Sequence, residues 1–228
     1  MRLLIALLCL VLCSVAAPAQ EKYVMPVDEV AQDASFLAFR TKLIAAAERR
    51  DVNYIISILD PKIELSYGGQ VGIADFRRMW KISQKNSPFW GEFMKVIKNG
   101  GAFSGEGKNK YTGFSAPYTF SSWPEEVDGF EYMAIFGSKV NLRETPRVDA
   151  NIIDRLSYNI VKPDYEKSVK AKTGKLDEEE DYEWIRVESL GGKSGFVKAD
   201  LVRSPIDYRA GFQKKRGVWR MTYFIAGD

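Results

Sequence analysis

Large apolar residues recur at intervals of three and four along the first hundred residues, a spacing typical of helices with one buried face. This spacing predicts a first helix that begins at Asp33 or Ser35, where a polar side chain can cap it, and ends near Arg50. Further helices are expected at 52–59, at 72–82 and from Ser87-Pro88 to the Gly100-Gly101 pair. The first part of the chain is therefore predicted to be rich in helix.

Alternation of apolar and polar residues, which indicates half-buried strands, occurs at 63–67 and through much of the second half of the chain. In the second half, strands are expected at 132–136, 140–143, 152–161, 184–187 and 195–197. Close-spaced short strands of this kind are typical of a small β-barrel. Apolar residues continue at 208–225, and such terminal strands need a partner. We expect them to pack with the N-terminal helices and the 63–67 strand.

Residues 1–19 have the organisation of a secretory signal peptide. Arg2 precedes an apolar run at 3–16, which is too short to span a membrane comfortably, and Ala17-Pro18-Ala19 resembles a cleavage site. We therefore expect an exported protein, periplasmic or extracellular, with no membrane span after cleavage. Both cysteines, Cys9 and Cys13, lie in this segment, so the mature chain is expected to contain no disulfide.

Together these patterns predict an α+β protein in four segments. They are a signal peptide at 1–19, an N-terminal α+β domain at 20–130, a small β-barrel at 131–203 and C-terminal strands at 204–228 that pack with the N-terminal domain.

The composition narrows the chemistry. The chain has no histidine, which excludes Ser-His-Asp and Cys-His hydrolases and the usual catalytic zinc sites. The net charge of +3 is small, so no nucleic-acid partner is expected, because that function needs a strong basic stripe. An acidic run at 177–181 lacks the alternating spacing and the glycine of a calcium loop. No metal ion, cofactor or catalytic residue is therefore predicted.

Four motifs of the second half occur in the order found in bacterial SH3 (SH3b) domains. They are Val140-Asn141-Leu142-Arg143 with a turn at Pro146, the apolar residues Ile152, Ile153 and Leu156, the Trp184-x-x-Val187 strand and Gly195-Phe196-Val197. Over residues 131–203 the chain thus resembles an SH3b domain. The resemblance implies an SH3-like barrel that binds peptidoglycan or an envelope protein and carries no active site. It leaves the oligomeric state open.

Aromatic residues beside the barrel predict the ligand site. Tyr158, Tyr182 and Trp184 are the expected ligand-binding residues, since a rigid aromatic ring offers contact area and a polar edge. The alternative is that Trp184 belongs to the core and that the two tyrosines are ordinary rim residues. Residues 162–182, with a basic and an acidic half, are expected to form a long, solvated hairpin insertion.

Two other functions stay open on the sequence. A carboxylate-based cell-wall hydrolase needs only two acids, and Glu64, Asp75, Glu92, Glu125, Glu126 and Asp128 are available. A structural or assembly role in the envelope would use an apolar patch near Trp80, Phe89, Trp90 and Phe93, unless these residues form the domain's own core. The helix-helix-strand order at the start also resembles cone-shaped α+β folds such as the nuclear-transport-factor-2-like family.

Overall fold

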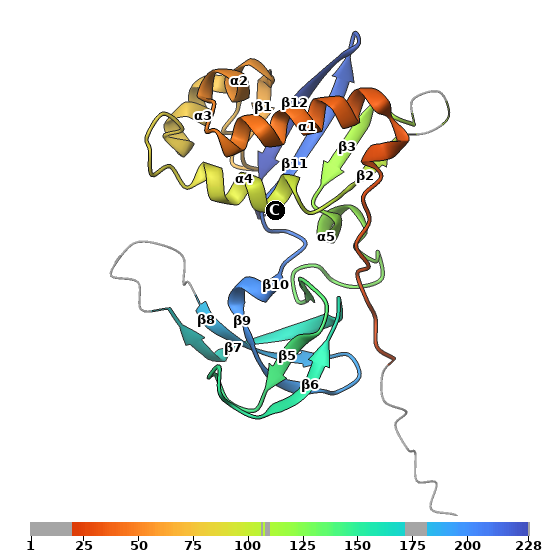
Figure 1. The fold of residues 1–228 in the computed structure, drawn as a ribbon, viewed down its shortest axis with the longest axis vertical. Coiled ribbons are helices and arrows are strands. Elements are labelled where there is room, and N and C mark those ends of the chain that lie inside the picture. The colour runs from red at the N-terminus through yellow and green to blue at the C-terminus, as the bar shows by residue number, and fades with distance from the viewer. Residues whose placement is uncertain (1–19, 106, 108–109, 172–181, 228) are drawn as a thin grey trace, which may run out of the picture.

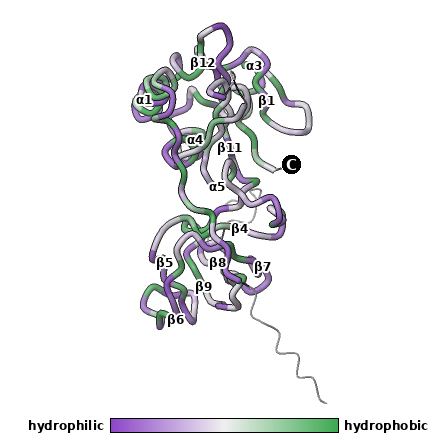
Figure 2. Tube along the Cα trace, turned by 90° about the vertical axis from the view of Figure 1, so that its right-hand side faces the viewer, coloured by the Kyte–Doolittle hydropathy of each residue, from purple (hydrophilic) through white to green (hydrophobic). Residues whose placement is uncertain are grey.

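Two lobes stacked end to end make up the molecule, and two perpendicular views agree on this arrangement (Figures 1 and 2). The computed structural model describes residues 20–105, 107, 110–171 and 182–227. One lobe combines helices with a five-stranded sheet, and the other is a curled, seven-stranded antiparallel sheet. We call them the helical lobe and the half-barrel. The protein is thus of the α+β class, as its sequence predicts.

The helical lobe packs its helices on a mixed sheet of order β1-β12-β11-β3-β2. Only the β1–β12 pair is parallel among the strand pairs described in this sheet. The helices are α1 (Ala34–Glu48), α2 (Val52–Ser57), α3 (Gly72–Trp80), α4 (Phe89–Ile97) and α5 (Tyr118–Ser121). The strands are β1 (Leu59–Glu64), β2 (Ala102–Ser104), β3 (Gly113–Ala116), β11 (Arg209–Lys215) and β12 (Val218–Ile225). The C-terminal hairpin therefore lies within the sheet of the first lobe, as its apolar pattern predicts.

Side-chain caps fix where the first two helices begin. The Asp33 carboxylate accepts the backbone N–H of Phe36 at 2.7 Å, and Asp51 accepts that of Tyr54 at 2.9 Å. Such caps satisfy backbone donors that the first turn of a helix leaves without partners. Of the two caps expected for α1, Asp33 is the one used.

The expected strand at 63–67 is displaced toward the N-terminus. The second helix ends at Ser57, and β1 follows almost at once, at Leu59, and includes Pro61. Proline lacks an N–H and is tolerated on an edge strand, and β1 is the edge of its sheet. Tyr67 consequently lies beyond the strand and is 60% exposed.

Aromatic side chains dominate the core of the helical lobe. The Phe36 ring of α1 lies 4.2 Å from Phe114 of β3 and 4.6 Å from Trp219 of β12, measured between ring centroids. A second group of rings joins helices α3 and α4 to the C-terminal strand, and it includes Trp80, Phe89, Phe93 and Phe224. Trp80, Phe89, Trp90 and Phe93 are all buried in this core, so they form no surface patch.

The half-barrel has the strand order β10-β4-β7-β8-β9-β5-β6, and each neighbouring pair is antiparallel. Its strands are β4 (Met133–Ile135), β5 (Val140–Arg143), β6 (Ile152–Leu156), β7 (Ile160–Lys170), β8 (Tyr182–Ser189), β9 (Ser194–Lys198) and β10 (Val202–Arg203). Val140, Leu142 and Leu156 point into its core, together with Val187 and Val197.

Two expectations for this region need correction. The single strand expected at 152–161 is two strands, β6 and β7, because Tyr158 adopts a left-handed backbone with φ of 61° and turns the chain. The insertion expected at 162–182 is also shorter, since β7 extends to Lys170 and β8 begins at Tyr182. The acidic run at 177–181 lies outside the described residues.

The N-terminal residues 21–29, here called the strap, join the two lobes. At the half-barrel, Ile160 N–H donates to the carbonyl of Lys22 and Val24 N–H donates to that of Tyr158, both at 2.8 Å. At the helical lobe, Gly101 N–H donates to the carbonyl of Val27, also at 2.8 Å. Figure 1 shows the strap descending from α1 along the side of the molecule.

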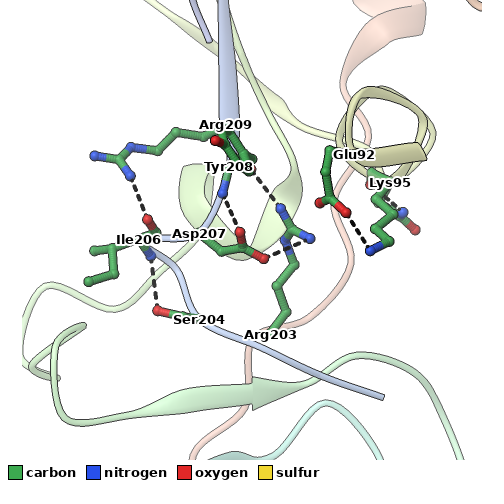
Figure 3. A network of polar contacts seen from close by, with 9 residues as sticks. Glu92, Lys95, Arg203, Ser204, Ile206, Asp207, Tyr208 and Arg209 are labelled. Carbon is green, nitrogen blue, oxygen red and sulfur yellow. Dashed lines mark hydrogen bonds and ion pairs between the residues drawn. The ribbon is translucent and has the colours of Figure 1, made fainter. Parts of the chain in front are cut away.

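A buried arginine joins the lobes at the other side of the junction. Arg203 of β10 contacts the Asp207 carboxylate at 3.1 Å and donates to the backbone carbonyl of Tyr208 at 2.6 Å (Figure 3). Its guanidinium lies over the Phe136 ring, which in turn stacks on Tyr118 at 5.7 Å. Both sides of the junction are therefore held by several contacts. Within the described part of the chain, no helix is long and apolar enough to cross a membrane.

Candidate ligand groove on the half-barrel

The three aromatic residues expected to bind a ligand lie in three different places. Tyr158 lines a hollow of about 330 Å³ between the lobes, beside the stacked rings of Tyr118 and Phe136. Burial raises the pKa of Tyr118 to about 12. Tyr158 therefore faces the junction and not the outer surface of the half-barrel.

Trp184 is buried on the face of β8 opposite the half-barrel core, because its neighbours Ile185 and Val187 are the residues that point into that core. It is only 4% exposed, and the ammonium group of Lys198 on the neighbouring strand lies 4.4 Å from its ring centroid. The residue is buried, as the alternative expects, but it is not part of the core cluster that Ile185 and Val187 help to form. Trp184 lines a hollow of about 430 Å³ together with Pro146 and Arg147, although only 4% of the residue is exposed.

Tyr182 lies beside a groove but is not one of its wall residues. Its ring packs against Tyr165 at a centroid distance of 5.3 Å, and Tyr165 lines a hollow of about 680 Å³. We call this hollow the β7 groove. Its walls are Tyr132, the β7 residues Lys162, Pro163, Asp164, Tyr165 and Glu166, and Glu188, Ser189 and Leu190 at the end of β8.

An irregularity in β7 places Tyr165 at the groove. The pairing of β7 with β8 shifts register between Asp164 and Val169, which is characteristic of a β-bulge. Side chains stabilise the bulge, because Ser168 Oγ donates to the Asp164 carbonyl at 2.7 Å and accepts the Arg186 N–H at 3.0 Å. Tyr165 is 48% exposed, and its hydroxyl donates to Met133 Sδ at 3.6 Å. Burial of part of the ring raises the pKa of the hydroxyl.

Pro163 limits what can bind along the free edge of β7. Strand β4 pairs with β7 only at Ile160 and Val161, so β7 has no described strand on that side from Lys162 onward. Proline has no N–H to donate, and its presence on an edge opposes pairing with an added strand. The groove is therefore suited to side-chain contacts with a ligand more than to strand addition.

Some charged side chains of the β7 groove have an oppositely charged partner and others do not. Lys162 Nζ bonds Glu131 at 2.8 Å, and this hydrogen bond raises the pKa of the lysine. Asp164 bonds Lys167 at 2.8 Å, which lowers the pKa of the aspartate. Among the described residues, the carboxylates of Glu166 and Glu188 have neither an ion pair nor a hydrogen bond.

The acids considered for hydrolysis are spread over the molecule. Asp75 pairs with Arg78 at 2.6 Å, and Glu92 pairs with Lys95 at 2.7 Å, so each carboxylate already has a neighbouring cation. The described residues contain no group of three or more carboxylate, imidazole or thiol side chains placed to hold a metal ion.

The residues that build the β7 groove were not singled out from the sequence. Five of them, from Lys162 to Glu166, fall in the segment interpreted as a solvated insertion. Pro163 was a usable signal, because a proline within a strand marks an edge position or a bulge.

Comparison with known proteins identifies no family for this chain. No family model, curated protein or solved structure matches the chain. The SH3b resemblance therefore stays a prediction that rests on its motif residues. One of these, Gly195, does lie where the backbones approach closely, since a Cβ there would be 2.6 Å from the carbonyl oxygen of Arg143.

Proposed function

We propose that this is a non-catalytic recognition protein of the cell envelope that binds the peptide part of peptidoglycan through its half-barrel. The β7 groove is the observation that carries the proposal. Its volume of about 680 Å³ suits a short peptide or a part of one, and tyrosine rings supply contact area with polar edges. The signal peptide expected at 1–19 supports an exported protein that meets this ligand outside the cytoplasm.

Co-sedimentation with purified peptidoglycan sacculi tests the proposal. The mature chain, residues 20–228, is mixed with sacculi at low and high salt, and we expect pelleting that persists at high salt. Tyr165→Ala removes an exposed groove wall and should weaken binding about tenfold, the size of loss typical of a central aromatic contact.

Met79→Ala is the matched control, because it truncates an exposed apolar side chain of α3 in the other lobe. It should pellet as the unchanged protein does. Absence of pelleting at either salt concentration would rule out wall recognition, and a crosslinking search for an envelope protein partner would follow. Equal pelleting of Tyr165→Ala and Met79→Ala would place wall binding outside the β7 groove.

A further inference from the structure

The hollow between the lobes, here called the junction hollow, is built from both of them. Its walls are residues 26–28 of the strap, residues 98–100 after α4, Tyr118 of α5 and, in the half-barrel, residues 136–137 and Tyr158. Helix α5 lies where the two lobes meet (Figure 1). Small-molecule sites occur preferentially between domains, and a volume of about 330 Å³ suits a small ligand.

Tyr118 brings a hydroxyl without a partner to this hollow. The residue is only 5% exposed, and among the described residues no hydrogen bond reaches its hydroxyl group. The hydroxyl is not one of the fully enclosed polar atoms either, so it keeps open surface beside the hollow that the residue lines. A largely buried hydroxyl of this kind costs free energy unless something in the hollow bonds to it.

A second hydroxyl, that of Tyr158, lies near the first. Tyr158 lines the same hollow, and its hydroxyl also has no hydrogen-bond partner in the described part of the chain. Burial is the main cause of the raised pKa of Tyr118, and the Tyr158 hydroxyl is close enough to raise this pKa further. Asn99, another wall residue, donates from its side-chain nitrogen to the Lys95 carbonyl at 2.6 Å, which leaves its amide oxygen free to accept.

The charged walls of the junction hollow are already paired. Asp28 accepts two hydrogen bonds from Arg40, at 2.6 and 2.7 Å, and Lys98 pairs with Glu48 at 2.7 Å. The buried Arg203 acts on this site electrostatically and has a carboxylate partner of its own. An ionic ligand group would therefore find no free counter-charge and would lose part of its hydration. Neutral hydroxyl groups suit the site, because they donate and accept as the tyrosine hydroxyls do.

We propose that the junction hollow is a second binding site, which takes a neutral, hydroxyl-bearing molecule of the size of one sugar ring. Tyr118 and Tyr158 bond to the hydroxyl groups of this ligand, and the strap forms one wall of the site. The site is separate from the β7 groove and does not depend on the proposed function. Because its walls come from both lobes, a bound ligand also holds the lobes together.

The test uses ¹⁵N-labelled residues 20–228 and the neutral probe methyl β-D-glucopyranoside. We expect saturating shifts of the amide signals of Val27, Asn99, Gly137 and Tyr158, with a dissociation constant on the order of 1 mM, as is ordinary for so small a ligand. The matched anionic analogue, methyl β-D-glucopyranosiduronate, should bind about tenfold more weakly, because its carboxylate has no counter-charge in the hollow. Equal binding of the two probes would contradict a site for neutral ligands.

Variants without the two hydroxyls separate binding from folding. Tyr118→Phe/Tyr158→Phe should weaken probe binding about tenfold, because two hydrogen bonds to the ligand are lost. Its thermal midpoint should be kept or raised, since neither hydroxyl has a described partner to lose. The matched control, Tyr223→Phe, removes a hydroxyl that does have a partner, Ser115 Oγ at 2.9 Å. This control should lower the midpoint and bind the probe like the unchanged protein.

Three results would overturn the inference. If no signal shifts with the neutral probe, the two hydroxyls bind water only. If Tyr118→Phe/Tyr158→Phe binds the probe as the unchanged protein does, the hydroxyls do not contact it. If the shifts are confined to residues 162–166 and 188–190, the probe binds in the β7 groove and the junction hollow is not a site for it.

Discussion

A single glycine controls how closely two strands of the half-barrel approach. A Cβ at Gly195 would lie 2.6 Å from the Arg143 carbonyl oxygen and 2.9 Å from Leu142 Cγ, both in the neighbouring strand β5. Backbone cannot move aside cheaply in a packed sheet. We therefore expect Gly195→Ala to lower the free energy of unfolding by about 1–3 kcal/mol, as overpacking does in cores. Urea denaturation followed by tryptophan fluorescence measures this change.

Gly91→Ala provides a control with the opposite sign. Gly91 lies inside α4, and apart from its chain neighbours and the backbone of its own helix no atom lies within 4 Å of the position that a Cβ would take. Alanine restricts the unfolded chain and favours helix, so the variant should gain about 0.5–1 kcal/mol. If Gly195→Ala were as stable as Gly91→Ala, strands β5 and β9 would not be in the close contact described.

At the scale of an element, the strap depends on Glu21. Its carboxylate accepts the Ser189 hydroxyl at 2.6 Å and the Asn159 amide at 3.1 Å, and both donors belong to buried residues. Glu21→Ala leaves these polar groups without an acceptor and should cost about 1–3 kcal/mol. The backbone hydrogen bonds of Val24 and Ile160 attach the strap to the half-barrel. The hydrogens of these two amides should therefore exchange faster in the variant.

Glu126→Ala is the control for Glu21→Ala. It removes a carboxylate that pairs with the strap but accepts no hydrogen bond from a buried residue among those described. Glu126 pairs with Lys22 of the strap at 2.8 Å, but the pair is exposed to solvent and screened. This variant should leave stability and exchange unchanged. Equal exchange in Glu21→Ala and Glu126→Ala would contradict a structural role for the Glu21 carboxylate.

The elements also show which features a sequence can predict. Helix α1 and its cap at Asp33 were predictable, because capping and apolar spacing act within a few residues. The displacement of β1 was not, because only the edge position in the sheet makes Pro61 acceptable within a strand. The β7 bulge depends on pairing with β8, and no local pattern reports it.

The ligand site depends on the same non-local information. Whether Tyr158, Tyr182 and Trp184 share a surface is decided by strand register and by the turn between β6 and β7. Register places Trp184 on the face of β8 opposite the half-barrel core, and the turn points Tyr158 toward the helical lobe. Only Tyr182 lies near the β7 groove, behind Tyr165.

At the scale of the molecule, the helical lobe depends on the last strands of the chain. Strand β12 lies between β1 and β11 in its sheet, and the hairpin contributes Phe212, Trp219, Met221 and Phe224 to the core. A chain that ends at residue 203 should therefore lose cooperative folding of the helical lobe. Thermal unfolding followed by circular dichroism checks this, and a midpoint equal to that of residues 20–228 would contradict it.

Val218→Ala serves as the control for the truncation. Val218 lies on β12 but is 54% exposed, so its removal takes little apolar area from the core. The midpoint should hardly change. A large loss in this variant would mean that the hairpin tip matters for a reason other than core packing.

The central position of β12 also determines the order in which the lobes can form during synthesis. The half-barrel is one continuous stretch, and its first and last strands, β4 and β10, pair with each other, so it can close once Arg203 has been made. The helical lobe begins earlier in the chain but lacks two strands of its sheet until Ile225 has followed. Long-range pairing of this kind is slow and leaves apolar surface exposed meanwhile. The lobe whose synthesis begins first is thus the last that can complete its sheet.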